Sequence, residues 1–326
     1  MRGTSTLPTV GIGEIRAAAE YLRGRIHRTP LMSATSVGSR VGVKLWVKAE
    51  NLQRTGSFKV RGALNCIRQL GADEKARGLV TISSGNHAQA VAWAAAAEGV
   101  RATVVMPETA APSKVAASRG YGADVVLHGD VFAAFQHMDE LRTRHGYPLV
   151  HPFDDPAVIA GQGTVGLELL EDLPDVDVVV VPIGGGGLIS GIAAALRALR
   201  PGVRIVGVEP VGAATMSRAL SAGEPVRLER IDTIADGLGA PVAGVLNLEH
   251  VRALVDDVVL LEDALIASAM SVMLERTKLL VEPAGAAALA AVLAGKAGCR
   301  PGDRVVVIAS GGNIDAARLR SLLPDR

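Results

Sequence analysis

Residues 176–199 read VDVVVVPIGGGGLISGIAAALRAL, a valine run followed by four glycines and an alanine-rich segment. An apolar run without polar alternation is typical of a strand covered on both faces, as in a parallel sheet. The uncharged part is nearly long enough to cross a bilayer, but Pro182 and the glycines would break a spanning helix in its middle. We therefore predict a buried strand, a glycine turn and a buried helix.

The same succession of a valine-rich run and a helical run recurs on both sides of this stretch. The other strand-like runs are GLVTIS (78–83), RATVVMP (101–107), ADVVLHG (123–129), RIVGVEP (204–210) and RVVVIAS (304–310). Alternating strands and helices predict doubly wound parallel sheets. Since one group of runs ends near residue 150 and the other begins near residue 176, we expect an α/β fold with two such domains.

Nearer the N-terminus, VKLWVKAE (43–50) alternates apolar and polar residues. A period of two is typical of a strand with one solvated face. We therefore expect Lys44 and Lys48 to be surface lysines.

Composition excludes several classes of partner. The 326 residues carry a net charge of +1, and only 3% are aromatic, so neither a nucleic acid nor an acidic membrane is an expected partner. Two cysteines are too few for a disulfide framework. Residues 1–20 lack the apolar core of a secretory signal, and we expect a cytoplasmic protein.

The glycine turn, Gly184, Gly185, Gly186 and Gly187 followed by Leu188, is a candidate phosphate site. Side-chain-free backbone lets N–H groups converge on an anion, and the following helix adds its positive end. No Gly-Lys-Ser/Thr follows, which excludes a P-loop. A dinucleotide site with Glu209 as the ribose ligand and a purely structural turn stay open as alternatives.

Two further polar turns follow predicted strands. Ser83, Ser84, Gly85, Asn86 and His87 carry more polar side chains than one helix cap needs, which favours binding of a carboxylate or a polar ring substituent. His87 alone is more typical of a capping or packing histidine. The turn that begins at Ser310 (SGGN, 310–313) is a third site of the same kind.

Lys59 lies in TGSFKVRGA (55–63), beside Phe58. A lysine here could be an ordinary side chain that extends to solvent. Lysine is also the residue that forms Schiff bases, and partial burial lowers its pKa towards neutrality.

Taken together, these segments resemble the threonine dehydratase and serine racemase family, which are fold type II pyridoxal phosphate (PLP) enzymes of the tryptophan synthase β-like fold. The resemblance extends from about residue 28 to residue 313. It is carried by seven motifs that occur in order: NLQRTGSFKVRGA (51–63), SSGNHAQ (83–89), HPFDDPAVIAGQGT (151–164), PIGGGGLISG (182–191), TIADGL (233–238), ERTKLLVEPAGAAALAA (275–291) and SGGN (310–313).

The resemblance implies a role for each matching position. Lys59 would carry PLP covalently with Phe58 beside it, Gly184 to Leu188 would hold its phosphate, Asn86 would contact the ring hydroxyl, and Ser310 would bond the pyridine nitrogen. Ser83 to His87 and Asp236 would bind the substrate. Residues 1–55 and 151–326 would form a large PLP-binding domain, and residues 56–150 a small mobile one.

The implied activity is dehydration of L-threonine or L-serine to a 2-oxo acid and ammonia by a homodimer or homotetramer. The alternatives are a serine racemase, in which Ser84 would act on the ring face opposite the lysine, and a dehydratase of another β-hydroxy amino acid such as 3-hydroxyaspartate. A PLP-binding or amino-acid-sensing protein without turnover is a further alternative, which the intact Lys59, Ser84 and Ser310 disfavour.

The resemblance also implies a cation site near Glu209 and the carbonyl of Ala213. Thr215 stands where metal-dependent relatives tend to carry aspartate. The missing charge argues against a tight divalent site and leaves a monovalent ion or a water as alternatives.

Overall fold

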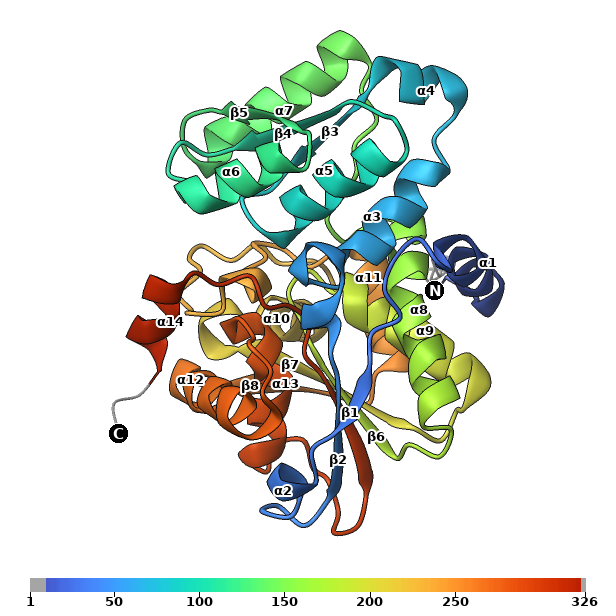
Figure 1. The fold of residues 1–326 in the computed structure, drawn as a ribbon, viewed down its shortest axis with the longest axis vertical. Helices are drawn as coiled ribbons and strands as arrows, with labels where there is room; N and C mark the ends of the chain where they lie inside the picture. The colour runs from blue at the N-terminus through green and yellow to red at the C-terminus, as the bar shows by residue number, and fades with distance from the viewer. Residues whose placement is uncertain (1–9, 324–326) are drawn as a thin grey trace.

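The computed structural model describes residues 10–323. Residues 1–9, which belong to the segment 1–20 in which we found no secretory signal, lie outside it. It confirms the α/β class, because two separate sheets with helices on their faces make up the molecule (Figure 1). The larger sheet has the strand order β1-β2-β9-β6-β7-β8, and the smaller one has the order β3-β4-β5. Strand β1 pairs antiparallel with β2, and all other neighbouring strands are parallel.

The strands are β1 Leu31–Ser33, β2 Lys44–Lys48, β3 Leu79–Ile82, β4 Ala102–Met106, β5 Asp124–Leu127, β6 Val178–Pro182, β7 Arg204–Pro210, β8 Asp257–Leu261 and β9 Arg304–Ile308. The helices are α1 Ile12–Leu22, α2 Thr35–Gly38, α3 Lys59–Arg68, α4 Ala72–Arg77, α5 Asn86–Ala97, α6 Pro112–Gly120, α7 Val131–His145, α8 Pro156–Asp172, α9 Gly187–Leu199, α10 Thr215–Ala222, α11 Val245–Leu254, α12 Asp263–Val272, α13 Pro283–Leu293 and α14 Ala316–Leu322. Short helical turns are η1 Glu50–Leu52, η2 Arg54–Gly56, η3 Val211–Ala213, η4 Asp236–Leu238 and η5 Met273–Thr277.

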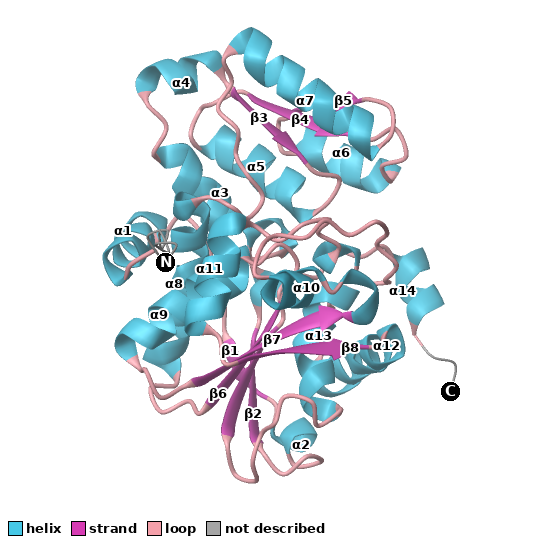
Figure 2. Cartoon of the chain, turned by 180° about the vertical axis from the view of Figure 1, so that it is seen from behind, coloured by secondary structure: helices cyan, strands magenta, loops and turns pink. Residues whose placement is uncertain are grey.

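The valine run forms β6, and its two faces enter different cores. Val178 and Val180 pack in a cluster with residues of α13, while Val179 and Val181 pack in a cluster with residues of α9. All four are buried, and helices cover both faces of the larger sheet (Figure 2). The sequence inference of a strand covered on both faces is therefore confirmed.

Helix α8 brings its neighbouring helices unusually close. A Cβ on Gly161 would lie 2.5 Å from the carbonyl oxygen of Arg61 in α3, and a Cβ on Gly191 of α9 would lie 2.3 Å from that of Ile159 in α8. Only glycine permits these approaches. The packing fixes the first turn of α3, where Lys59 is the first residue.

The prediction for Lys48 was wrong. Lys44 is exposed, but Lys48 is fully buried, and its Nζ donates to the carbonyl of Thr29 and to Glu168 Oε2, both at 2.6 Å. The ammonium belongs to a buried ionic cluster in which Arg61 binds both Glu50 and Glu168. Strand alternation predicted the face of Lys48 correctly, but α8 supplies an acid that covers this face.

The smaller sheet lies above the larger one in Figure 1, together with α4 to α7. Helix α3 joins the two units, since Val60 and Leu64 share a core with Val91 of α5 and Val158 of α8. The division at residues 56 and 150 and the mobility of the smaller unit stay predictions.

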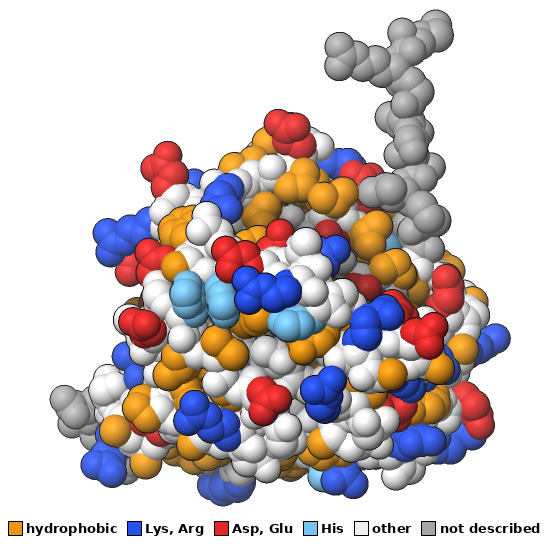
Figure 3. All heavy atoms as spheres, turned by 90° about the horizontal axis from the view of Figure 1, so that it is seen from above, with side chains coloured by type: hydrophobic (Ala, Val, Ile, Leu, Met, Phe, Trp, Pro, Cys, Tyr) orange, Lys and Arg blue, Asp and Glu red, His pale blue; other side chains and the backbone are white. Residues whose placement is uncertain are grey.

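Two expectations about partners concern the surface. No helix within residues 10–323 has the length and apolar character that crossing a membrane requires. On the face seen in Figure 3, acidic and basic side chains are interspersed rather than gathered by sign.

Cys66 and Cys299 are free thiols; Cys66 is buried in α3, whereas Cys299 is half-buried in the loop after α13.

Candidate active site

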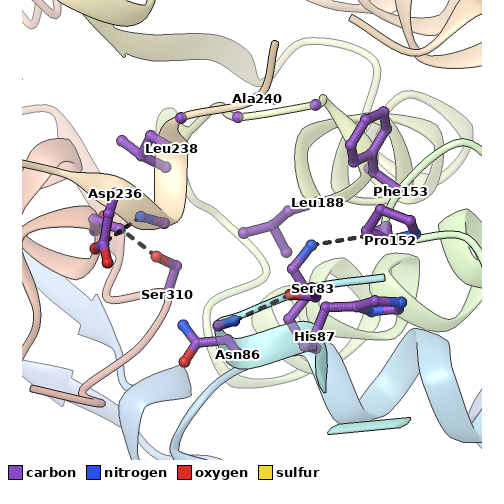
Figure 4. Close-up of a pocket in the computed structure, with 18 of the residues that line it drawn as sticks. Ser83, Asn86, His87, Pro152, Phe153, Leu188, Asp236, Leu238, Ala240 and Ser310 are labelled. Carbon is purple, nitrogen blue, oxygen red and sulfur yellow. Dashed lines mark hydrogen bonds between the residues drawn. The ribbon is translucent and has the colours of Figure 1, made fainter. Parts of the chain in front are cut away.

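One cavity of about 300 Å³ gathers the predicted cofactor and substrate residues (Figure 4). They line it from the start of α3, the β3–α5 turn, the β6–α9 turn, η4 and the end of β9. The predicted residues on its wall are Phe58, Lys59, Ser83, Ser84, Gly85, Asn86, His87, Gly184, Gly185, Gly186, Gly187, Leu188, Asp236 and Ser310. Glu209 and Ala213 are not among the residues that line it.

A hydrogen bond to the backbone holds Lys59 at the cavity. Its Nζ donates to the carbonyl of Pro152 at 2.8 Å, the dashed line at Pro152 in Figure 4, and lies 5.2 Å from the centre of the Phe58 ring. Burial lowers the pKa of Lys59 to about 8, against an opposing attraction from Glu282. A buried amine that loses its proton this readily is suited to attack an aldehyde.

This pKa predicts the pH dependence of PLP uptake. Only the neutral amine of Lys59 can add to the aldehyde, so the rate of covalent uptake by apo-protein should rise with pH and level off above about 8. Stopped-flow absorbance at fixed PLP would measure it, with free lysine as the reference for the pH response of PLP itself. A rate that still climbs steeply above pH 10 would contradict the lowered pKa of this amine.

The glycine turn is an anion cradle without side chains. Within the described residues, the amides of Gly184 through Leu188 donate to no protein acceptor. A Cβ on Gly185 would lie 2.3 Å from the Phe153 ring, and Gly186 adopts φ +100. Glycine is therefore required at both positions. Open amides at the start of α9, in the cavity that Lys59 lines, fit the phosphate of PLP.

The β3–α5 turn offers polar groups and the N-terminus of α5. Ser83 Oγ accepts from the amide of Gly85 at 3.1 Å, and Ser84 lines the cavity. His87 Nε2 lies 2.9 Å from the carbonyl of Val150, which can only accept, so Nε2 carries the proton. Burial, with Lys59 nearby, lowers the pKa of His87 to about 3. The neutral, hydrogen-bonded ring favours the packing alternative over an acid or base.

Ser310 is buried at the end of β9, and its Oγ donates to the carbonyl of Ala284 at 3.2 Å. Rotation about its Cβ–Oγ bond would redirect the proton to a ring nitrogen in the cavity. A hydroxyl in this position can bond a neutral pyridine, but it cannot stabilise a pyridinium as a carboxylate does.

Two charged groups on the cavity wall escaped sequence inference. Lys114 of α6 pairs with Asp236 of η4 at 2.7 Å, linking the helices of the smaller sheet to the larger unit. Glu282, at the N-cap of α13, accepts from Asn86 Nδ2 at 2.6 Å. Burial, with Asp236 nearby, raises the pKa of Glu282 to about 7. An acid before proline within the apolar stretch 279–293 was the available signal for Glu282.

Of the two predicted cation ligands, Glu209 caps the start of α10, and the cation site stays a prediction. Glu209 is buried and accepts from the amides of Met216 and Ser217 at 2.6 and 2.9 Å, while Thr215 Oγ1 donates to the carbonyl of Ala240. Burial raises the pKa of Glu209, and these hydrogen bonds oppose the rise. No cluster of three metal-binding side chains occurs in the part of the chain that the structure describes. A cation at the Ala213 carbonyl would compete with these bonds for Glu209.

A lysine with a lowered pKa, a glycine anion cradle and a doubly wound fold together define a PLP-dependent class of enzyme. The chain belongs to the family of pyridoxal-phosphate dependent enzymes, whose model matches residues 22–311. The resemblance inferred from the motifs is thereby confirmed.

Three similar proteins have names that state an activity. The chain is 48% identical over 302 residues to an L-threonine ammonia-lyase of Geobacter sulfurreducens, covering 92% of this chain and 75% of that protein. It is 44% identical over 324 residues to the catabolic L-threonine dehydratase TdcB of Escherichia coli K12, covering 99% and 98%. The structure of maize serine racemase superposes with a TM-score of 0.92 at 41% identity, covering 96% and 97%.

Proposed function

We propose that this chain is a PLP-dependent ammonia-lyase that eliminates water from L-threonine or L-serine and yields a 2-oxo acid and ammonia. The observation that carries the proposal is the amine of Lys59 and the open amides of Gly184 to Leu188 in one cavity. The two curated relatives named for L-threonine support it. A cavity of about 300 Å³ has room for the cofactor together with a small amino acid.

The groups on the cavity wall would have different roles in this reaction. PLP, when bound, would supply the electron sink for the bond broken at the substrate Cα. Lys59 Nζ would take the Cα proton, because its lowered pKa leaves part of the amine neutral near neutral pH. The turn from Ser83 to His87, at the N-terminus of α5, would hold the substrate carboxylate. The β-hydroxyl would leave as water, with a proton equivalent to the one that Lys59 removes from Cα, and the enamine product would hydrolyse to the 2-oxo acid and ammonia.

Ser310 favours elimination over the competing outcomes. Its hydroxyl would not stabilise a protonated pyridine nitrogen as a carboxylate does. Negative charge that develops at the substrate Cα would therefore be less stabilised than it would be with an acid at this position. Prompt loss of the β-hydroxyl then competes well with return of the proton.

Serine racemisation is the second candidate function. Ser84 lines the same cavity as Lys59, so a proton donor is available besides the lysine. The likeness to maize serine racemase supports this candidate. Both activities share the step at Cα and differ in whether the β-hydroxyl leaves before a proton returns.

A substrate panel separates these functions. Holoenzyme would be incubated with L-threonine, L-serine, D-serine and 3-hydroxyaspartate, with 2-oxo acid measured and leftover serine analysed on a chiral column. We expect L-threonine to release 2-oxo acid fastest, with residual L-serine keeping its configuration. Serine that becomes racemic faster than pyruvate forms would favour the racemase. Turnover confined to 3-hydroxyaspartate would favour a dehydratase of that amino acid.

On the resemblance alone, we further propose that the chain is a homodimer or homotetramer, and we keep as a proposal the cytoplasmic location expected from the sequence. Sedimentation of purified holoenzyme would decide its oligomeric state.

A further inference from the structure

A line of side-chain amides crosses between the two units beside the cavity. Asn313 Nδ2 donates to the carbonyl of Thr55 at 2.7 Å and to Asn86 Oδ1 at 2.8 Å. Asn86 Nδ2 in turn donates to Glu282 Oε1 at 2.6 Å. We call this series, Thr55–Asn313–Asn86–Glu282, the amide relay. Asn86 comes from α5 of the smaller unit, and the other three residues flank strands and helices of the larger one.

The direction of every bond in the amide relay follows from its first acceptor. A backbone carbonyl can only accept, so the Asn313 group that faces Thr55 has to be the NH₂. The same NH₂ faces Asn86, which therefore presents its oxygen to Asn313 and its NH₂ to Glu282. A carboxylate accepts this N–H, which makes the bond charge-assisted. The orientation of Asn86 is thus determined at both ends.

Two glycines leave the room that the amide relay occupies. A Cβ on Gly311 would lie 2.4 Å from Glu282 Oε1 and 3.1 Å from Asn86 Nδ2. A Cβ on Gly56 would lie 2.3 Å from Asn313 Oδ1. Any side chain at either position would displace a member of the relay.

The remaining N–H of Asn86 is the part that can act on a ligand. Asn86 Nδ2 carries two hydrogens, and within residues 10–323 it makes one hydrogen bond, to Glu282. Asn86 lines the cavity with Lys59 and Ser310. A flipped amide would turn its carbonyl oxygen towards Glu282, where two acceptors would repel each other.

We propose that Glu282 and Asn313 are positioning residues for the cofactor, because they fix the Asn86 amide so that its free N–H faces the oxygen substituent of the PLP ring. The inference rests on the proposed function, since it presupposes that PLP occupies the cavity. It adds to that function two residues that do not themselves hold the phosphate, the ring nitrogen or the Schiff base. At pH 8 Glu282 is the ionised acceptor that the relay requires, since burial and the nearby Asp236 raise its pKa only to about 7, against the opposing effects of Asn86, Lys114 and Lys59.

The test is a mutant cycle read out by cofactor binding rather than by turnover. Apo-forms of the wild type and its variants would be titrated with PLP at pH 8, giving a dissociation constant and the absorption spectrum of the bound cofactor. Glu282→Met removes the acceptor at similar size, whereas Glu282→Gln keeps one. Glu262, the exposed N-cap of α12, supplies the matched control Glu262→Gln.

We expect Glu282→Met to weaken PLP binding about tenfold, which corresponds to the loss of roughly one charge-assisted hydrogen bond. The absorption spectrum of the bound cofactor should also change. Glu282→Gln should stay within about threefold of the wild type, and Glu262→Gln should match it. In an Asn86→Ala background, Glu282→Met should add no further loss, since its effect passes through Asn86.

Three results would overturn the inference. These are wild-type binding in Glu282→Met, losses that multiply in the double mutant, and a wild-type protein that takes up no PLP. The last result would sink the proposed function as well, whereas the first two leave it intact. If melting of the apo-protein shows that Glu282→Met does not fold, Asn313→Leu takes its place in the same cycle. Because it removes a neutral hydrogen bond to Asn86, its expected loss is about threefold to tenfold, and the contradicting results are the same.

Discussion

Replacing Lys59 with alanine is expected to lower kcat/KM for L-threonine by more than about 10³-fold, because one side chain provides both the covalent attachment and the proton acceptor at Cα. The variant should also lose PLP on dialysis. Its fold should persist, since within residues 10–323 the side chain makes a single hydrogen bond, to the carbonyl of Pro152. The 2-oxo acid assay measures the first effect, and absorbance after dialysis the second.

The matched control is Lys44→Ala, which removes an exposed lysine from β2. It should leave both readouts unchanged. A Lys59→Ala protein that keeps a tenth of the wild-type activity would show that another group carries the chemistry.

The largest loss of stability is expected from Arg61→Met. The guanidinium is fully buried and bonds Glu50 at 2.8 Å through two nitrogens and Glu168 at 2.7 and 2.9 Å. Methionine fills a similar volume but leaves Glu50 without its cation, and a buried charge that loses its partner costs about 3–5 kcal/mol. The free energy of unfolding from urea titration should fall by this amount.

Arg23→Met serves as the control, because Arg23 pairs with Glu20 on the surface, where both side chains are more than 70% exposed. An exposed pair contributes less than about 1 kcal/mol, so this variant should unfold near the wild-type midpoint. Equal shifts for the two arginine variants would contradict the role assigned to the buried cluster.

Most of the fold could be predicted from periodicity. The valine runs that became β6, β7 and β9 are buried on both faces, and such strands carry an unbroken apolar signal. Strand β8 was missed although its sequence, DVVLL (257–261), carries the same kind of apolar run as the strands that were predicted. Strand β1 has only three residues and carries no period. Lys48 was misplaced, since its acid partner is 120 residues away in the chain.

Some features of the candidate site could likewise be predicted from the sequence, and others could not. The position of the glycine turn at the cavity could be predicted, because turns after parallel strands meet at one edge of a sheet, whereas the role proposed for Lys59 came from the family resemblance. The hydrogen bonds that orient them were not predicted. Asn86 and Asn313 are 227 residues apart, and Lys114 and Asp236 are 122 apart. No local pattern encodes pairs that only the folded chain brings together.

The identity of the lysine that carries PLP tests this mechanism most directly. Holoenzyme would be reduced with borohydride and digested, and the peptide that bears the reduced cofactor would be sequenced by mass spectrometry. The cofactor should be found on Lys59 alone, in the segment SFKVR (57–61). A cofactor found on Lys114 or another lysine, or no covalent label at all, would contradict it.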